Sequence, residues 1–319
     1  MTGRVSLKME IVDKLARSSF GTLRPRIPSR PPSRPLRGRY PGLVTVCVAA
    51  LADVGDSIAV ACDSMLSSLE FSADKIAHKL YPLSEKLQWA AMISGDDLTH
   101  VVPLLETTVI EMFSLTDDTN SLTNVELALT KAYKKVRDRY VQDLILSPIG
   151  LDFEVLRNRP KWNPYLGDRL ASVSLGCDLL IAGFDNIACG HVLTVEHPGI
   201  VRNHDPVGWA AIGSGTFSAA GSLLHHSVNS EMELARVLYH VCEAKFMAES
   251  ASGVGEHTTA MVIRPRVPLK EHCELSDAFI SGIRGDWERE GKPRVPKGTL
   301  EYISEQLKKF PGNKISQAD

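Results

Sequence analysis

The sequence predicts an α+β fold in which two antiparallel sheets lie face to face, with a pair of helices on the outer face of each sheet. The expected strands and helices come in blocks along the chain rather than in alternation, which argues against a doubly wound parallel sheet. The expected strands are apolar on both faces, so both faces of each sheet must be covered. Apolar residues make up 44% of the 319 residues, which is enough for a large core.

The first block of elements opens with a β-hairpin. Two apolar runs, LVTVCVAALA and SIAVACDS, are joined by a turn around residues 53–56. An extended stretch over residues 76–83 and a strand over residues 87–94 follow. Apolar residues at helical spacing then predict two helices, in LTHVVPLLETTVIEMFSL and in SLTNVELALTKAYKKVRDRYVQDLI. The second helix is expected to start at a capping box formed by Thr123 and Glu126.

The second block follows the same rhythm of strands and then two helices. Residues 147–176 are expected to be irregular because they contain several prolines and glycines. Four strands are predicted next, in CDLLIAGF, HVLTVEH, GIVRN and GWAAIG. Two helices, in TFSAAGSLLHHS and EMELARVLYHVCEAKFMAES, precede a last strand in TTAMVIRP. In the polar tail, one helical piece is expected in TLEYISEQLKKF.

Charge and proline content divide the chain into three parts. Residues 1–42 contain ten basic and two acidic residues and six of the 18 prolines, which predicts a disordered basic extension. This extension is interpreted as a tether to nucleic acid or membrane, a transit peptide, or a segment absent from the working protein. Residues 43–264 are expected to form the folded domain, and residues 265–319 a polar C-terminal appendage.

Composition argues against several classes of protein. No window approaches the roughly 18 uninterrupted apolar residues of a membrane helix, so no membrane span is predicted. The acidic body of the chain lacks a basic stripe with interleaved aromatic residues, which argues against binding of nucleic acid. The six cysteines lie in apolar segments without CxxC spacing, which predicts buried free thiols in a reducing, cytoplasmic compartment.

Neither a cofactor site nor a metal site is predicted. The glycines in residues 213–221 lie between a strand and a helix, but the third glycine of a GxGxxG motif is missing. The neighbours His225 and His226, like His191 and His197, have no carboxylate or cysteine partner at ligand spacing. These histidines are therefore interpreted as surface or core residues.

Residues that carry chemistry gather at the head of the first expected strand. If the chain started at Thr45, the hydroxyl and the α-amine would share one residue, and an amine with a pKa of about 8 accepts the hydroxyl proton at neutral pH. Asp63, at the end of the second strand, and Lys79 could lie beside this threonine, and the lysine ammonium would activate the nucleophile. The backbone N–H of Gly95 is suited to an oxyanion hole.

Six separated motifs extend this constellation over residues 43–264. They are TVCVA from Thr45, DS at 63–64, HKL at 78–80, SGDD at 94–97, IGSG at 212–215 and ESASG at 249–253. In their order and approximate spacing they resemble the proteasome-type N-terminal-nucleophile (Ntn) hydrolases. That family includes the 20S β-subunits, and the resemblance is greatest to the bacterial ancestral β-subunit and ClpQ-type peptidase group.

The resemblance implies an αββα sandwich that hydrolyses peptide bonds without ATP inside a self-assembled homo-oligomeric ring. Thr45 would be the nucleophile of a threonine-type endopeptidase after loss of residues 1–44, with Asp63 and Lys79 as its charge partners. Gly95 would donate its N–H to the oxyanion. The substrate would be a peptide or protein, and an ATPase partner is not identified by the sequence. The shell that orients the threonine amine and a water would consist of Ser214, Glu249 and Ser252.

Departures from the family pattern keep alternatives open. Lys75 competes with Lys79 for the lysine position, although spacing favours Lys79. Glu249 stands where the family usually has aspartate. Val44 precedes Thr45 where self-processing β-subunits usually carry glycine, so a start at a GUG codon for Val44, followed by removal of the initiator methionine, is a second route to a free Thr45 amine. The functional alternatives are a catalytically silent ring subunit with a scaffolding role and an Ntn amidohydrolase acting on a small amide.

Overall fold

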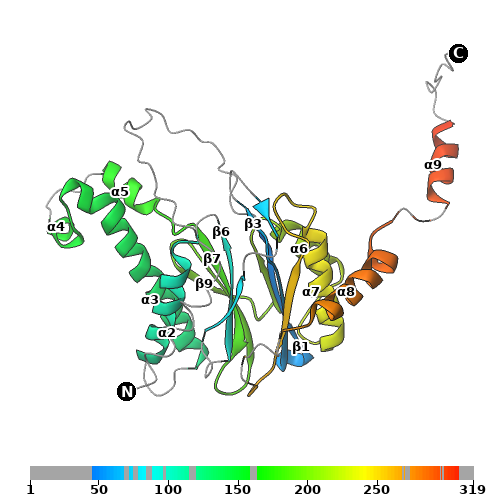
Figure 1. Cartoon of the computed structure of the whole chain (residues 1–319), viewed down its shortest axis with the longest axis horizontal. Helices are drawn as coiled ribbons and strands as arrows, with labels where there is room; N and C mark the ends of the chain where they lie inside the picture. Colours follow the sequence, from blue (N-terminus) through cyan, green and yellow to red (C-terminus); the bar gives the residue numbers. More distant parts are fainter. Residues whose placement is uncertain are drawn as a thin grey trace, which may run out of the picture.

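A computed structural model shows how these elements are arranged. It describes residues 45–308 with the exception of 68–71, 75–77, 84–87, 96–97, 115–119, 159–163, 268, 270–273, 295 and 297. The expected basic extension over residues 1–42 and the rival lysine Lys75 lie outside the described residues. In the described part, two sheets lie face to face between two layers of helices (Figure 1). The predicted α+β class and four-layer architecture are confirmed.

The first sheet has the strand order β10-β1-β2-β11, and every pairing in it is antiparallel. The predicted hairpin is present, with a short 3-10 turn, η1 (Asp53–Gly55), between β1 and β2. Helices α6 and α7 cover the outer face of this sheet (Figure 1). The bounds of these elements are Cys47–Ala52 for β1, Ser57–Asp63 for β2, Trp209–Ile212 for β10, Thr258–Ile263 for β11, Thr216–His225 for α6 and Leu234–Ala248 for α7.

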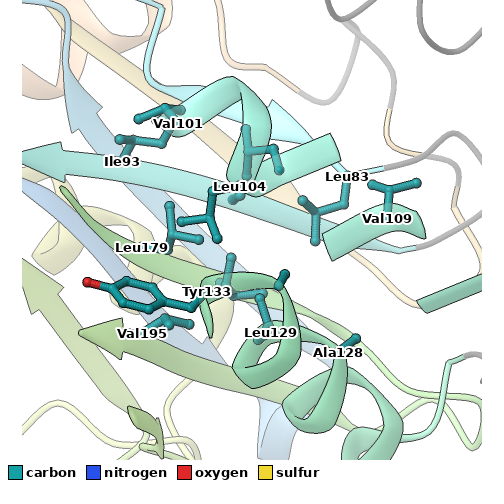
Figure 2. Packing of buried hydrophobic residues seen from close by; sticks show 14 of the residues in the cluster. Leu83, Ile93, Val101, Leu104, Val109, Ala128, Leu129, Tyr133, Leu179 and Val195 are labelled. Atoms are coloured by element: carbon teal, nitrogen blue, oxygen red, sulfur yellow. The ribbon is translucent and has the colours of Figure 1, made fainter. Parts of the chain in front are cut away.

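The second sheet has the order β5-β6-β7-β8-β9 and is also antiparallel throughout. Helices α2 and α3 pack on its outer face (Figures 1 and 2). The bounds are Leu80–Pro82 for β5, Trp89–Gly95 for β6, Cys177–Phe184 for β7, Gly190–Glu196 for β8, Ile200–Asn203 for β9, Val101–Ser114 for α2 and Leu122–Val141 for α3. A separate two-stranded ribbon pairs β3 (Leu66–Ser67) with β4 (Ser72–Ala73).

Strand β1 shows why the strands are apolar on both faces. Because side chains alternate across a strand, Val48 and Ala50 point to the layer of α6 and α7, whereas Cys47, Ala49 and Leu51 point to the second sheet. The space between the sheets is filled by this second set and its partners from β6 and β7. Every residue of β1 is buried, so the start of β1 is held firmly.

The outer layer of the second sheet follows helical periodicity. Val101, Leu104 and Val109 of α2, with Leu129 and Tyr133 of α3, face the strands (Figure 2). The N-cap of α3 is Ser121, two residues before the predicted cap at Thr123. The helix boundary predicted from the capping box is therefore wrong. The hydroxyl of Ser121 itself makes no capping bond to the helix.

Two regions contain more helix than the sequence predicts. Within the stretch expected to be irregular, α3 continues into a π-helical turn (Gln142–Leu146) and a 3-10 turn (Ser147–Ile149). Two short helices follow, α4 (Phe153–Arg157) and α5 (Pro164–Ala171). Apolar residues such as Leu156 are buried against the end of α3, and this packing outweighs the local prolines and glycines.

The tail contains α8 (Asp277–Asp286) and a π-helical turn (Trp287–Gly291) in addition to the expected helix α9 (Thr299–Lys308). Ser276 caps α8 by accepting a hydrogen bond from the N–H of Phe279 (3.3 Å). Ile280 and Trp287 are buried with the residues of α7, and the N–H of Leu275 donates to the carbonyl of Ala260 in β11 (2.8 Å). Helix α8 therefore packs on the sandwich, whereas α9 lies away from it (Figure 1).

The cysteines agree only in part with the sequence analysis. The five described cysteines are free thiols, and four of them are buried, but Cys189 is exposed in the turn between β7 and β8. The sixth, Cys273, lies outside the described residues. Among the described helices, none combines the length and the apolar composition needed to cross a bilayer.

Candidate active site

The residues at the head of β1 and the end of β2 meet because the hairpin is antiparallel. Val46 lies opposite Asp63, whose N–H donates to the carbonyl of Val46 (3.2 Å). This pairing brings the Thr45 hydroxyl to Asp63, to which it donates a hydrogen bond. Lys79, directly before β5, reaches both residues: its Nζ donates to Thr45 Oγ1 and to Asp63 Oδ1, the latter at 2.9 Å. All three side chains are buried, with exposed fractions of 2%, 0% and 7% for Thr45, Asp63 and Lys79.

The Asp63 carboxylate is fixed by backbone donors as well. Oδ1 also accepts from the N–H of Val46 (3.0 Å), and Oδ2 accepts from the N–H groups of Met65 (3.0 Å) and Gly255 (3.3 Å). A buried charge is tolerated when it is paired and its lone pairs are satisfied. Asp63 therefore provides a rigid negative group that holds both the Lys79 ammonium and the Thr45 hydroxyl in place.

The IGSG motif after β10 holds the Thr45 backbone. Ser214 Oγ and the N–H of Gly215 both donate to the Thr45 carbonyl, at 3.3 and 3.2 Å. Gly213 has a φ of +95°, and a Cβ atom there would come within 2.3 Å of the Thr45 carbonyl oxygen. Only glycine fits this position. The sequence-predicted Ser214 thus contacts Thr45, at its carbonyl.

Gly95 ends β6 and lies opposite Cys177 of β7. Its φ is +146°, and a Cβ atom would come within 2.1 Å of the Gly176 carbonyl oxygen. Close approach of the β7 backbone thus explains the requirement for glycine. The site contacts that the structure describes do not join Gly95 to Thr45.

Glu249 and Ser252 do not contact Thr45 within the described part of the chain. The Glu249 carboxylate accepts hydrogen bonds from Lys245 Nζ (2.6 Å) and from Arg284 Nη1 (2.8 Å), and Ser252 is exposed. Instead of the predicted contact with the threonine amine, Glu249 forms one ion pair with Lys245, one helical turn earlier in the chain, and another with Arg284 of α8. Lysine at i and glutamate at i+4 face each other on a helix, which explains the first of these pairs.

Lys245 is a site residue that the sequence analysis missed. Its side chain is fully buried, and its Nζ donates to Glu249 Oε1 and to the carbonyls of Gly255 (2.7 Å) and Glu256 (2.9 Å). Arg284 donates to the same Glu256 carbonyl (2.7 Å). These bonds fix the loop that delivers the Gly255 N–H to Asp63. The available signal was a lysine within the apolar run VLYHVCEAKFMA, four residues before a glutamate.

Charge and burial also decide which groups near Thr45 are reactive. Cys47 lies two residues from Thr45, and its Sγ contacts the carbonyl of Ile93 (3.4 Å). Burial, together with a hydrogen bond to Cys62, raises the pKa of the Cys47 thiol well above its usual value despite the charge of Lys79. The thiol is therefore protonated, and thiolates are the nucleophilic form. Burial likewise lowers the pKa of Lys245, a shift that the charge of Glu249 opposes.

Comparison with known proteins gives a match by structure alone. No family model matches the sequence, and no curated protein matches it either. Among solved structures, Anbu (ancestral beta-subunit) from Yersinia bercovieri is similar, with a TM-score of 0.55. The match covers 85% of this chain and 100% of that chain, at 14% sequence identity. This chain has a proteasome-like Ntn fold.

At this identity, the likeness to Anbu shows the fold and leaves the chemistry to the residues themselves. The sequence-based resemblance to proteasome-type subunits is thereby confirmed at the level of the fold. Three of the seven expected site residues (Thr45, Asp63 and Lys79) form a direct contact network, and Ser214 joins it through the Thr45 backbone.

Proposed function

We propose that this protein is a threonine-type peptidase in which Thr45 Oγ1 is the nucleophile. One observation carries the proposal: in a buried site at the head of β1, the Thr45 hydroxyl is bound by an ammonium and a carboxylate at the same time. An adjacent cation favours the deprotonated form of a hydroxyl, and burial strengthens that interaction. The proteasome-like fold supports the same reading.

The reaction requires that Thr45 be the first residue, so that its α-amine is free. Oγ1 attacks the carbonyl carbon of the scissile peptide bond while its proton passes to this amine. The C–N bond then breaks, and the amine returns the proton to the leaving nitrogen, which leaves an ester on Thr45. A water that gives its proton to the same amine hydrolyses the ester and restores the threonine.

The surrounding residues take positioning roles in this proposal. Lys79 stabilises the developing charge on Oγ1, and Asp63 holds the lysine and the hydroxyl in one arrangement. The N–H of Gly95 receives the oxyanion of the tetrahedral intermediate. Ser214 and Gly215 fix the Thr45 carbonyl, which sets the direction of the amine. Glu249 acts through Lys245 and the Gly255 loop, and Ser252 is left to contact a water.

We also propose that the chain acts on peptides in the cytoplasm as a homo-oligomeric ring. Several large apolar side chains are exposed on the outer helices, including Phe217 (91% exposed) and Leu224 (65%) on α6 and Ile110 and Phe113 on α2. Apolar residues exposed on helices that also cover a sheet are suited to packing against a second copy.

The test is covalent labelling with an epoxyketone, a reagent that bonds to a hydroxyl and a free amine on one residue. The full chain is purified from its native host, and its intact mass gives the first residue. The same labelling is carried out on a form in which cleavage of a fused leader leaves Thr45 first. We expect one label per chain, mapped to Thr45, whenever Thr45 is the first residue.

The control variants separate chemistry from folding. Thr45→Ser is expected to keep the label and Thr45→Ala to lose it, and thermal unfolding of both variants checks that each is folded. A native protein that begins before Thr45, or a folded chain that starts at Thr45 and takes no label, contradicts the proposal and favours a silent subunit. Cleavage of small amides without cleavage of peptides favours the amidohydrolase.

A further inference from the structure

Two histidines and a glutamate meet between α6 and α7, away from the Thr45 contacts. His226 follows the last residue of α6, and His240 and Glu243 lie one turn apart on α7. His226 Nε2 and His240 Nδ1 both lie 3.0 Å from Glu243 Oε2. His226 has no ligand partner at local spacing in the sequence, because its partners lie on the next helix.

The cluster is built rather than incidental to the surface. The side chains of His240 and Glu243 are 9% and 6% exposed, and that of His226 is 32% exposed. The two imidazole rings stack, with centroids 4.2 Å apart and planes 23° from parallel. Within the described part of the chain, no lysine or arginine forms an ion pair with Glu243. A buried carboxylate needs a compensating positive charge, and among the described residues its ion-pair partners are two imidazole groups.

The ligand atoms have the chemistry and the spacing of a metal site. One imidazole nitrogen from each histidine and one carboxylate oxygen all lie within 4.8 Å of one another. Zinc binds histidine nitrogen and carboxylate oxygen at about 2.0–2.2 Å, which places tetrahedral ligands about 3.3 Å apart. The two nitrogen-to-oxygen separations of 3.0 Å are close to that value, and the one between His240 and Glu243 is also a hydrogen bond.

We propose that His226, His240 and Glu243 form a binding site for a divalent transition-metal ion, with zinc the best match to two imidazoles and one carboxylate. The fourth position of the ion is open to water. Because the ligands come from the end of α6 and the middle of α7, the ion ties the two outer helices together. Helix α7 carries Lys245 further along and ends next to its C-cap, Glu249, so the ion also steadies the helix that supports the Gly255 loop.

The experiment uses the full chain without a histidine tag. Bound metal is removed from the protein with a chelator, and the protein is then dialysed against a small excess of zinc. Its metal content is measured by inductively coupled plasma mass spectrometry. A titration with cobalt, which gives visible absorption bands when four-coordinate, reports the ligand geometry in the unmodified protein. We expect one zinc per chain and a cobalt spectrum of a tetrahedral nitrogen and oxygen site.

The matched variants are His226→Gln and His225→Gln. His225 is the neighbouring exposed histidine, whose ring contacts that of His226 edge-on (centroids 4.9 Å apart) but which is not a ligand. Loss of a ligand is expected to weaken zinc binding by more than the roughly 10- to 100-fold seen when outer-shell partners are removed, whereas His225→Gln leaves it unchanged.

Absence of bound zinc or cobalt in the folded wild-type protein overturns the proposal, as does equal zinc affinity in the two variants. If His226→Gln fails to fold, the cobalt spectrum of the wild-type protein and the zinc content of His225→Gln still decide the question. A thermal unfolding temperature that rises with zinc in the wild-type protein and in His225→Gln, but not in His226→Gln, is the supporting result.

Discussion

Two buried lysines lie near Asp63, and they differ in what their ammonium groups bind. Lys79 binds the Asp63 carboxylate and the hydroxyl of Thr45, a group that can lose a proton. Lys245 binds the Glu249 carboxylate and two backbone carbonyls, which have no proton to lose. The difference separates a lysine that tunes a reactive group from a lysine that builds the loop beside it.

The comparison shows that burial and an ion pair do not identify a catalytic lysine. Both side chains are almost completely inaccessible, and both contact an acidic residue. Only the partners other than the carboxylate distinguish them: an alcohol for Lys79 and the carbonyls of the Gly255 loop for Lys245. Substituting each lysine by methionine, which retains much of the volume, therefore tests the distinction.

The largest effect is expected for Lys79→Met. Without the ammonium, nothing stabilises charge on Thr45 Oγ1, and labelling by the epoxyketone should slow by about 10²–10⁴-fold in the form with a free Thr45 amine. The free energy of unfolding should also fall, by about 3–5 kcal/mol, because the buried Asp63 loses its charge partner. Labelling kinetics and urea unfolding measure the two effects. A folded Lys79→Met protein that is labelled at the wild-type rate would refute the assignment of Lys79.

Lys245→Met is the matched substitution, and it should lower stability by a similar amount while changing the labelling rate much less. Two backbone carbonyls lose their donor and Glu249 keeps only Arg284, so the free energy of unfolding should fall by about 3 kcal/mol. Labelling should slow by no more than about tenfold, because the Gly255 N–H is one of several donors to Asp63. If labelling falls as far as in Lys79→Met, the two lysines are not functionally distinct.

These two lysines also mark the limit of prediction from the sequence. The Thr45–Asp63 pair was predictable because a hairpin brings the start of one strand to the end of the next, whereas Lys79 was assigned by its order and spacing in the family pattern. The Lys245 network was not predictable, because Arg284 comes from a tail whose polar composition hides α8. Short helices α4 and α5 were missed for the same reason: distant packing, rather than local preference, stabilises them.

The histidine cluster shows the same dependence on distant contacts. His240 and Glu243 are at helical spacing, but His226 reaches them only because α6 and α7 pack side by side. A pattern search limited to local spacing therefore finds the pair on α7 but reads His226 as an isolated residue. Which face of a helix meets a neighbouring helix depends on tertiary packing, which residue spacing within one segment does not show.

A smaller effect is expected for Arg284→Met on α8. Arg284 binds Glu249 and the Glu256 carbonyl, and its guanidinium lies 4.1 Å from the centre of the Phe246 ring. Because Lys245 remains on Glu249, we expect a loss of about 1–2 kcal/mol in the free energy of unfolding.

A double-mutant cycle with Glu249→Gln measures the coupling directly. We expect the two substitutions together to cost less than the sum of each alone, because they remove one shared contact. Additive costs would show that Arg284 stabilises the protein through Phe246 instead. In either case the labelling rate at Thr45 should change less than in Lys245→Met, since Arg284 does not contact Gly255 in the described network.

The smallest effect is expected on the second sheet, where His191 Nδ1 donates a hydrogen bond to the Asp205 carboxylate (2.7 Å). Burial lowers the pKa of His191, but the hydrogen bond and the charge of Asp205, with those of Asp185, outweigh burial and raise it. Burial raises the pKa of Asp205, and its hydrogen bonds to His191 and to the N–H of Val192 outweigh that effect and lower it.

The sign of the pH dependence follows from these two shifts. A raised histidine pKa contributes stability that is present below the unfolded value of about 6.5 and is lost as the pH rises through the folded value. The lowered pKa of Asp205 contributes stability that is present above its unfolded value and is lost only in acid. The free energy of unfolding should therefore decline as the pH rises from about 6.5, and His191→Asn should remove this decline. His204→Asn is the matched control: burial, opposed in part by Glu196, lowers the pKa of His204, so the decline at rising pH should persist in that variant. A decline that survives His191→Asn would show that the charge of this histidine does not stabilise the second sheet.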